Sequence, residues 1–284
     1  GLQKKLDILE ENIINVLLRI YFKRGIFMNK TVLITGATSG IGYEFSKIFM
    51  ENNYDVILVG RNLEKLMELE GFSKKKSVRA YIYKFDLSLS ENIDILYKKI
   101  KTEVGKVDIL INNAGIGFNG EFNEIDWQKQ LDIINVNIIS LTKLTKLILK
   151  DMINEKEGKI LNVSSTGAYQ PGPLISVYYA SKAYVLSFSE ALREEVKDKG
   201  INVVTLCPGA TKTNFSKRAG KGDLDVAMSA KEVAEYGYKA LIKNKAICIP
   251  GFMNKVLVFL SKLSPTTLNA KIVKKIQNKA ISKK

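Results

Sequence analysis

The stretch that most constrains the fold lies near the beginning of the chain, at residues 31–42. It reads Thr-Val-Leu-Ile-Thr-Gly-Ala-Thr-Ser-Gly-Ile-Gly, a short apolar run followed by three closely spaced glycines, and an amphipathic helical pattern comes next. A strand, a glycine turn and a helix start in this order are typical of the phosphate-binding corner of a dinucleotide fold. Gly36 would allow the tight turn, Gly40 would let backbone approach a pyrophosphate, and Gly42 would let the helix pack close to the strand. The alternative is an ordinary loop between a strand and a helix.

The composition narrows the chemistry open to the chain. It contains no histidine, which excludes Ser-His and Cys-His triads and argues against a zinc site, so we expect no metal. Its two cysteines, Cys207 and Cys248, lie in apolar strand-like runs and are interpreted as buried free thiols of a reducing, cytoplasmic compartment. No run of about 18 apolar residues occurs, so no spanning helix is expected. A length of 284 residues suits one well-buried α/β domain.

The net charge of +15, from 44 basic and 29 acidic residues, is concentrated at the C-terminal end. No acidic residue follows Glu235, whereas lysines recur up to Lys284. Two interpretations remain: a solvated basic tail, or a surface helix that favours anionic lipid or another acidic partner and places the protein peripherally at a membrane. Nucleic acid is disfavoured as a partner, because no aromatic–basic interleaving or known binding motif accompanies the lysines.

From Met28 onward, strand-like and helical patterns alternate. The strand-like runs are 32–35, 56–60, 80–85, 109–112, 159–163, 203–207 and 246–249. The helical patterns between them lie near 41–52, 62–70, 89–103, 124–152, 178–198 and 230–243. This alternation predicts an α/β fold, a single doubly wound (Rossmann) domain with a mainly parallel seven-stranded sheet and helices on both faces. Right-handed crossovers then place a ligand crevice at the carboxyl ends of the strands.

We divide the chain into three parts. Residues 1–27 form an N-terminal helical extension, which either lies upstream of a natural start at Met28 or docks on the domain or on a membrane surface. Residues 28–250 are the dinucleotide-binding and catalytic domain, and residues 251–284 are a basic amphipathic tail. We expect an apolar stripe on this tail to pack on the domain or on a second subunit, with a lipid-facing or substrate-shielding role as the alternative. Its members are Val256, Leu257, Phe259, Leu260 and Leu263.

The end of the second predicted strand bears on the choice of cofactor. A corner that prefers NAD(H) would carry Asp or Glu there to bind the ribose hydroxyls. This chain has Gly60 and Arg61 instead, with no acid until Glu64. A guanidinium can pair with the 2′-phosphate of NADP(H), which a carboxylate would repel, so NADP(H) is predicted over NAD(H). The alternative is that Arg61 only packs over the adenine ring.

Two further strand ends carry residues that suit a bound dinucleotide. Asp86, after the third predicted strand, would accept a hydrogen bond from the adenine amino group, or would act as a helix N-cap two residues ahead of Ser88. The run Asn-Asn-Ala-Gly at 112–115 follows the fourth predicted strand. Its small side chains would let the cofactor lie against the backbone, while the asparagines hold the loop by local hydrogen bonds.

The candidate catalytic pair is Tyr178 and Lys182, which lie one turn apart on one face of a predicted helix. The same spacing occurs at two helix positions that look solvated, Tyr43/Lys47 and Tyr97/Lys101. Only Tyr178 follows a strand that ends in two serines at the carboxyl edge of the predicted sheet. Context, rather than spacing, therefore selects this pair.

An ammonium beside a phenol makes the phenol more acidic. At about 4 Å and an effective dielectric near 20, the ammonium favours phenolate by at most about 4 kcal/mol, or about three pKa units, whereas burial acts in the opposite direction. Lys182 would then lower the pKa of Tyr178 toward neutral pH, with help from the positive charge of the oxidised nicotinamide. Ser165 would polarise the substrate oxygen while Tyr178 gives or takes its proton. Ser164 and Tyr179 are the competing serine and phenol.

Together these motifs resemble the short-chain dehydrogenase/reductase family, in the subgroup with Thr-Gly-x-x-x-Gly-x-Gly and Tyr-x-x-x-Lys, over about residues 30–250. The resemblance implies that Asn137 maintains a water-linked proton relay to Lys182 and that Lys182 also holds the nicotinamide ribose. Ser165 precedes Tyr178 by thirteen residues, the usual separation in the family, which favours these two over Ser164 and Tyr179. The catalytic set implied by the resemblance is Asn137, Ser165, Tyr178 and Lys182.

The resemblance also implies a cofactor-binding set, in which the segment from Pro208 to Thr213 touches the nicotinamide end. Its members are Gly36, Ser39, Gly40, Ile41, Gly42, Arg61, Asp86, Leu87, Asn113, Ala114, Gly115, Tyr178, Lys182, Pro208, Gly209 and Thr213. Ser39 stands where many NADP-dependent members carry Arg or Lys, so the NADP(H) prediction depends on Arg61 alone. Ser140 replaces a glycine common in the family, and residues 211–228 correspond to the variable substrate lid.

We therefore expect an NADP(H)-dependent oxidoreductase that transfers a hydride between nicotinamide and a carbonyl or secondary alcohol. Family members pair through the helices at 124–152 and 178–198, which implies a homodimer or homotetramer. The segment 249–264 is similar to tails of bacterial reductases of lipid-like or bulky carbonyls. A non-catalytic NADP(H)-binding sensor and a membrane-surface scaffold on the same fold are the alternatives, and a sensor would have no use for the complete catalytic set.

Overall fold

The computed structural model describes residues 29–213 and 227–281. By its internal contacts the chain divides into two units, residues 1–30 and 31–284, and the fold below is that of the second unit. The expected N-terminal extension at 1–27 and most of the expected lid at 211–228 lie outside the described residues.

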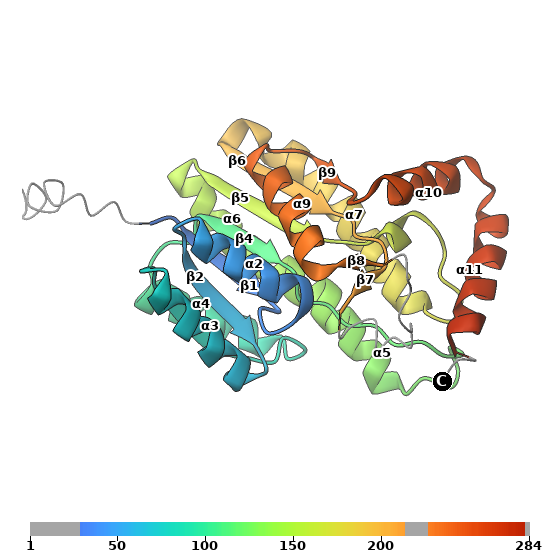
Figure 1. Cartoon of the computed structure of the whole chain (residues 1–284), viewed down its shortest axis with the longest axis horizontal. Helices are drawn as coiled ribbons and strands as arrows, with labels where there is room; N and C mark the ends of the chain where they lie inside the picture. Colours follow the sequence, from blue (N-terminus) through green and yellow to red (C-terminus); the bar gives the residue numbers. More distant parts are fainter. Residues whose placement is uncertain (1–28, 214–226, 282–284) are drawn as a thin grey trace, which may run out of the picture. The chain divides into compact units, whose positions relative to one another are not determined.

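Seven parallel strands form the central sheet, in the order β3-β2-β1-β4-β5-β6-β9 (Figure 1). They are β1 (Thr31–Thr35), β2 (Asp55–Gly60), β3 (Ala80–Lys84), β4 (Ile109–Asn112), β5 (Gly158–Val163), β6 (Ile201–Leu206) and β9 (Ile247–Cys248). A separate parallel ladder joins β7 (Thr211–Lys212) to β8 (Met228–Ser229). The predicted doubly wound α/β fold with a seven-stranded sheet is confirmed.

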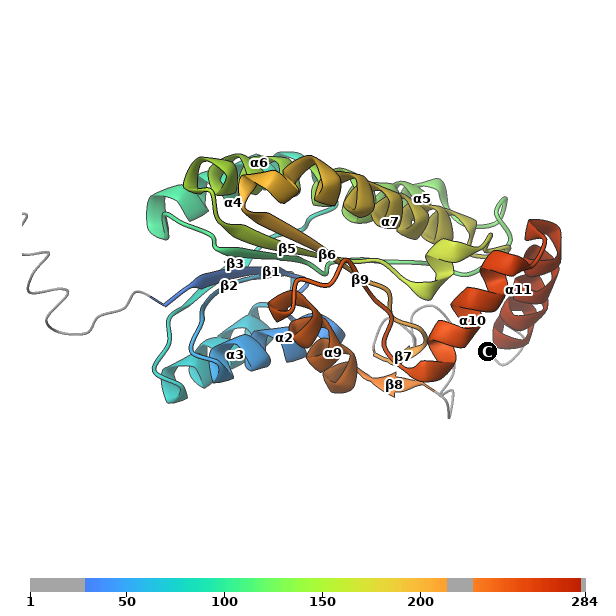
Figure 2. The same cartoon turned by 90° about the horizontal axis from the view of Figure 1, so that it is seen from above.

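Helices cover both faces of this sheet (Figure 2). The helices of one face are α2 (Gly40–Glu51), α3 (Leu63–Lys75) and α9 (Ala230–Ile242), and those of the other are α4 (Glu91–Glu103), α6 (Leu141–Glu155) and α7 (Ser176–Val196). Each strand sends alternate side chains to the two layers: Val32 and Ile34 join the apolar cluster with α2 and α9, and Leu33 joins the cluster with α4 and α6. Burial on both faces explains why the strands are continuously apolar.

The centre of the sheet is the point where the strand order reverses. β1 and β4 are neighbours, and the chain leaves β1 toward β2 and β3 but leaves β4 toward β5 and β6. The loops that follow β1 and β4 therefore diverge to opposite sides. Such a divergence leaves a crevice outside the carboxyl ends of the two strands.

The prediction of a single helix at 124–152 is wrong in detail, because the structure has three helical segments in this region. A π-helix at Asn135–Ser140 separates α5 (Trp127–Ile134) from α6. A π-helical turn contains an additional residue, so it shifts the direction of the side chains around it, and such turns are frequent at functional sites.

Two short 3₁₀ segments, Thr166–Tyr169 and Lys197–Lys199, flank α7.

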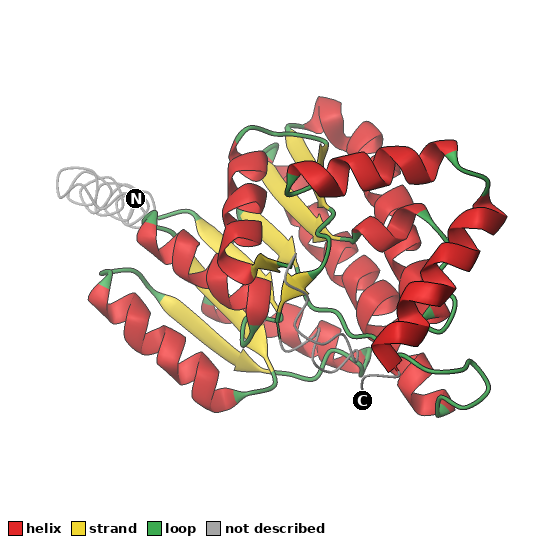
Figure 3. Cartoon of the chain, turned by 45° about the vertical axis from the view of Figure 1, so that its right-hand side comes forward, coloured by secondary structure: helices red, strands yellow, loops and turns green. Residues whose placement is uncertain are grey.

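The chain after residue 250 folds as two helices, α10 (Phe252–Leu263) and α11 (Thr266–Ile281), shown in Figure 3. α10 faces the domain with Val258, which is buried, and with Asn254, which packs against Gly209. The expected stripe points elsewhere: the exposed members are Leu257, Phe259, Leu260 and Leu263, and Val256 is half-buried. The expectation that this stripe packs on its own domain is therefore wrong. In the described part of the chain, no helix combines the length and apolar character needed to cross a membrane.

Both cysteines are buried and free, as predicted. Burial raises the pKa of the Cys207 thiol to about 11, so this thiol stays protonated near neutral pH. A buried, protonated thiol is a structural rather than a reactive group.

Phe49 of α2 provides a test of the packing between helix and sheet. It is fully buried, and its ring lies 5.2 Å from that of Tyr54 and 5.3 Å from that of Tyr238. Because truncation leaves a cavity, Phe49→Ala should lower the free energy of unfolding by about 3–5 kcal/mol. Phe122→Ala, at a side chain that is 62% exposed, should change it by less than about 0.5 kcal/mol. Denaturant unfolding followed by circular dichroism measures both, and equal effects would contradict the packing described.

Candidate active site

A cavity of about 400 Å³ opens at the carboxyl ends of strands β1 to β6. All of the predicted site residues line it except Gly42 and Asn137. Gly42 lies against the carbonyl of Gly36, inside the glycine turn, and Asn137 lies behind Gly115. The fold thus brings together residues that are far apart in the sequence.

Two glycines of the first loop permit backbone contacts that a side chain would block. Gly36 has φ +66°, and a Cβ there would lie 2.9 Å from Cα of Ala114. A Cβ on Gly42 would lie 2.3 Å from the carbonyl oxygen of Gly36. The loops after β1 and β4 can therefore touch, and α2 begins directly against the turn. Residues 39–41 at the start of α2 line the cavity, where the free N–H groups of a helix N-terminus suit a phosphate.

Hydrogen bonds fasten the loop after β1 to the loop after β4. The Thr35 hydroxyl accepts from the backbone N–H groups of Asn113 (3.0 Å) and Ala114 (3.1 Å). The Asn113 side chain donates to the carbonyls of Thr35 (3.0 Å) and Gly36 (3.2 Å). Asn113 thus holds the cofactor corner in shape, as expected of this motif. Its neighbour Asn112 is buried and donates to Thr145 and Asn162, away from the cavity.

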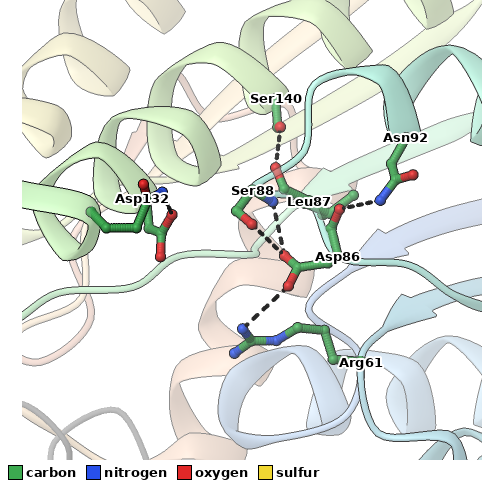
Figure 4. A network of polar contacts seen from close by, with 8 residues as sticks. Arg61, Asp86, Leu87, Ser88, Asn92, Asp132 and Ser140 are labelled. Atoms are coloured by element: carbon green, nitrogen blue, oxygen red, sulfur yellow. Dashed lines mark hydrogen bonds and ion pairs between the residues drawn. The ribbon is translucent and has the colours of Figure 1, made fainter.

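Arg61 and Asp86 face each other at the adenine end of the predicted crevice (Figure 4). Arg61 Nη1 lies 3.7 Å from Asp86 Oδ2, and the Arg61 side chain is 58% exposed. Asp86 Oδ1 accepts from the backbone N–H and the hydroxyl of Ser88, both at 2.9 Å. Burial opposes ionisation of Asp86, but the Ser88 hydrogen bonds and the Arg61 charge outweigh it and lower the pKa of this carboxyl. Asp86 therefore organises its own turn and orients Arg61.

Ser140 has a role that the sequence did not reveal. Its hydroxyl, at the end of the π-helix, donates to the carbonyl of Leu87 (Figure 4). Asn92 donates to the carbonyl of Asp86 at 2.8 Å. The loop after β3 is thereby tied to the π-helix, so a serine in place of the common glycine is used structurally.

The π-helix positions Asn137, which is fully buried. Its Oδ1 accepts from the N–H of Ile116 (2.9 Å), and its Nδ2 donates to the Ile116 carbonyl (3.0 Å) and to the Ser181 hydroxyl (2.9 Å). A Cβ on Gly115 would lie 3.5 Å from Asn137 Oδ1 and 3.2 Å from Lys182 Nζ. Asn137 Oδ1 and Lys182 Nζ thus lie near each other on one side of Gly115, in the loop after β4.

Tyr178, Lys182 and Ser165 lie together in the cavity wall. Tyr178 is 8% exposed and Lys182 is 4% exposed. Lys182 Nζ lies 5.7 Å from the centre of the Tyr178 ring and donates to the Val163 carbonyl at 2.8 Å. Burial lowers the pKa of Lys182 to about 8.

The expected acidification of Tyr178 by Lys182 together with the charge of an oxidised nicotinamide stays a prediction, and burial acts against it. Burial raises the pKa of Tyr178, and the hydrogen bond with Ser165 offsets only part of that rise. Desolvation, which penalises the charged phenolate, therefore dominates.

The two competing residues are occupied elsewhere. The Ser164 hydroxyl is buried and donates to the Lys182 carbonyl at 2.7 Å, which fixes α7 against β5. The Tyr179 ring packs against Gly172, where a Cβ would lie 2.3 Å from the ring. Burial raises the pKa of the Tyr179 phenol, and a hydrogen bond with Gln277 of α11 acts against this. The two other Tyr-x-x-x-Lys tyrosines are hydrogen-bonded to surface carboxylates, Tyr43 to Glu68 and Tyr97 to Asp151.

Sequence reasoning missed the contribution of α11. Its buried face carries Val273, which packs with Ile175, Tyr178 and Tyr179. Gln277 is 1% exposed and accepts from Asn119 Nδ2 at 3.1 Å. No motif marks these residues, and only the positions of buried side chains reveal them. Among residues 29–213 and 227–281, no group of three or more Cys, Asp or Glu is placed to hold a metal ion.

Comparisons with known proteins agree with this geometry. The sequence model of the family described as short chain dehydrogenase matches residues 30–223. The chain is 30% identical over 250 residues to the ketoacyl reductase HetN of Nostoc sp., with 84% of this chain and 87% of that protein covered. It is 33% identical over 261 residues to the very-long-chain 3-oxoacyl-CoA reductase of Anas platyrhynchos, with 89% of this chain and 82% of that protein covered.

A solved structure of a short-chain dehydrogenase is also similar to this chain. A short-chain dehydrogenase from Sphingobium yanoikuyae in complex with NADPH is similar with a TM-score of 0.74 and 29% identity, covering 78% of this chain and 88% of that one. Fold, cavity and sequence therefore agree. The chain belongs to the short-chain dehydrogenase/reductase family of oxidoreductases, whose Rossmann fold binds a nicotinamide cofactor.

Proposed function

We propose that the chain is an NADP(H)-dependent enzyme that interconverts a carbonyl and a secondary alcohol of a hydrophobic, lipid-like substrate. The observation that carries this proposal is the burial of Tyr178 beside Lys182 in a cavity that also contains the glycine corner. Burying an amine is costly unless something compensates it. An apolar side chain at position 182 would serve a purely structural helix better, so the amine is interpreted as functional.

Tyr178 is the proposed proton donor in the reductive direction. A bound nicotinamide supplies the hydride for the carbonyl carbon. Because burial keeps the pKa of Tyr178 above its ordinary value, the phenol holds its proton near neutral pH and can give it to the substrate oxygen. Ser165, which is hydrogen-bonded with Tyr178, would donate to the same oxygen and stabilise the charge that develops there.

Lys182 and Asn137 are proposed to restore that proton. The pKa of Lys182, about 8, lets the amine both hold and release a proton near neutral pH. Asn137 Oδ1 and Lys182 Nζ lie on the same side of Gly115, within 3.5 Å of the position that a Cβ there would take, and Asn137 would hold the water-linked relay. Lys182 is also proposed to bind the ribose hydroxyls of the cofactor.

NADP(H) is proposed over NAD(H) on the evidence of the corner after β2. The Arg61 guanidinium is more than half exposed and pairs with a single carboxylate at 3.7 Å, so it can turn toward a 2′-phosphate. Ser39 precedes α2 and makes no capping hydrogen bond within that helix, which leaves its hydroxyl for the same phosphate. The NADPH complex of the Sphingobium yanoikuyae relative is consistent with this choice.

The relatives suggest the substrate class. Ketoacyl reductase and very-long-chain 3-oxoacyl-CoA reductase are the names of two similar proteins, so a 3-oxoacyl chain is the first substrate to test. The alternative is an NADP(H)-binding sensor without turnover.

Assembly and location are also proposals. Trp127, Ile139 and Tyr184, on α5, the π-helix and α7, are exposed apolar side chains in the region expected to pair, which supports a homodimer or homotetramer. The two buried free thiols support a reducing, cytoplasmic setting.

Replacing the proposed proton donor tests the chemistry. Tyr178→Phe should reduce kcat for a 3-oxoacyl substrate about 10²–10⁴-fold, because the proton donor is lost. NADPH binding, measured by fluorescence titration, should persist. Tyr43→Phe removes the hydroxyl of a surface tyrosine with the same Tyr-x-x-x-Lys spacing and should leave kcat unchanged. Near-normal turnover by Tyr178→Phe would overturn the proposed site, and NADPH binding without turnover by the wild type across a carbonyl panel would favour the sensor.

The pKa of Lys182 has a consequence for stability. Below about pH 8 the amine is charged in both the folded and the unfolded chain. Between pH 8 and the ordinary value of 10.5, the folded amine is neutral and the unfolded amine is still protonated. The unfolded state then binds more protons, so raising the pH stabilises the fold. The difference in free energy of unfolding between wild type and Lys182→Met should therefore rise in favour of the wild type from pH 8 to pH 10.5, as measured by denaturant titrations. A difference that does not change with pH would contradict the burial of the amine.

Arg61 is the test of cofactor preference. Arg61→Asp should weaken NADPH use by about 10–100-fold, the value of a lost charged hydrogen bond, and shift the preference toward NADH. Arg61→Lys keeps the charge and should retain a preference for NADPH at reduced affinity. The measurement is kcat/KM with each cofactor. A wild type that uses NADH far better than NADPH would defeat the assignment.

A further inference from the structure

The two C-terminal helices, α10 and α11, gather exposed apolar side chains. Nine of the nineteen large apolar side chains that are exposed in the described part of the chain lie on them. They are Phe252, Met253, Leu257, Phe259, Leu260 and Leu263 on α10, and Leu268, Ile272 and Ile276 on α11. On α11 they repeat every four residues and so share one face. We call these nine side chains the apolar rim.

Attachment of the helices does not require the apolar rim. α10 contacts the domain through Val258, and α11 does so through Asn269, Val273 and Gln277, all of which are buried. Asn269 also donates to the Ser261 carbonyl at 2.7 Å, which joins the two helices. The apolar rim therefore faces outward from a surface that is already fixed to the domain.

The charge carried by α10 and α11 themselves has one sign. No Asp or Glu occurs from residue 236 to residue 284. The exposed lysines of the two helices are Lys255, Lys262, Lys271, Lys274, Lys275 and Lys279. Long lysine stems can lie along an apolar surface while their ammonium groups reach polar surroundings.

We propose that α10 and α11 dock on the surface of an anionic phospholipid bilayer, with the apolar rim inserted among the acyl chains and the lysines at the acidic headgroups. Helices with an apolar face and a lysine-rich polar face bind membranes in this way. A second copy of the chain would bring the same positive charge to the interface, and like charges in contact disfavour that partner. Charge complementarity thus selects an acidic surface, and the apolar rim selects lipid.

The placement of these helices gives the docking a consequence for the site. Figures 1 and 2 both show α10 and α11 beyond the carboxyl ends of the strands, on the side where the cavity opens. The inner face of α11 packs on Tyr178 and Tyr179, next to the cavity. Docking would therefore bring the cavity near the bilayer, where a lipid-like substrate resides. Only this consequence depends on the proposed function.

Vesicle flotation of the full-length protein tests the docking without any activity measurement. The protein should float with vesicles of phosphatidylcholine and phosphatidylglycerol and remain behind with phosphatidylcholine alone. Phe259→Asp combined with Leu263→Asp should reduce binding to the anionic vesicles at least about 100-fold, because two inserted side chains are lost. Lys271→Glu, Lys274→Glu and Lys275→Glu together should reduce it at least about tenfold.

A matched control separates docking from the attraction of any basic protein to acidic lipid. Phe122→Asp combined with Met67→Asp changes the charge equally at exposed apolar positions outside α10 and α11 and should bind like the wild type. Thermal unfolding and NADPH binding should be unchanged in every variant. Equal loss in the control and in the Phe259/Leu263 variant would overturn the proposal. It would also fail if the Phe259/Leu263 variant changed the oligomeric state in light scattering and left vesicle binding intact.

Discussion

The contact between the loops after β1 and β4 is the constraint on which the rest of the site depends. Gly36 and Ala114 approach so closely that a Cβ on Gly36 would lie 2.9 Å from the Ala114 backbone, and Thr35 and Asn113 hold the two loops in that position. The contact closes the floor of the cavity at the point where the strand order reverses. It also fixes the direction in which α2 starts, and so determines where a phosphate can bind.

A second constraint is electrostatic. Tyr178 and Lys182 are buried side by side, and burial is the largest cause of the pKa shift of each group, so it disfavours the charged form of both. The phenol is thereby kept as a proton donor and the amine as a group that titrates near pH 8. This differs from a simple picture in which an ammonium makes a phenol acidic.

Much of the fold was predictable, and the exceptions have physical causes. Strands buried on both faces give continuous apolar runs, and the glycine corner has few alternatives, so the sheet and the cavity-lining residues were found. The π-helix was missed because Asn135–Ser140 keeps a helical pattern and its extra residue leaves no mark in the sequence. Val258, rather than the apolar stripe, faces the domain because the orientation of α10 is set by tertiary contacts. Gln277 was missed because a lone buried glutamine carries no motif.

The most direct test of the central claim is a crystal structure with NADP(H) bound. The account predicts that the Tyr178 hydroxyl faces the reactive carbon of the nicotinamide ring and that the Lys182 amine contacts the ribose hydroxyls. A complex in which that hydroxyl lies well away from the ring, or the amine lies away from the sugar, would contradict it.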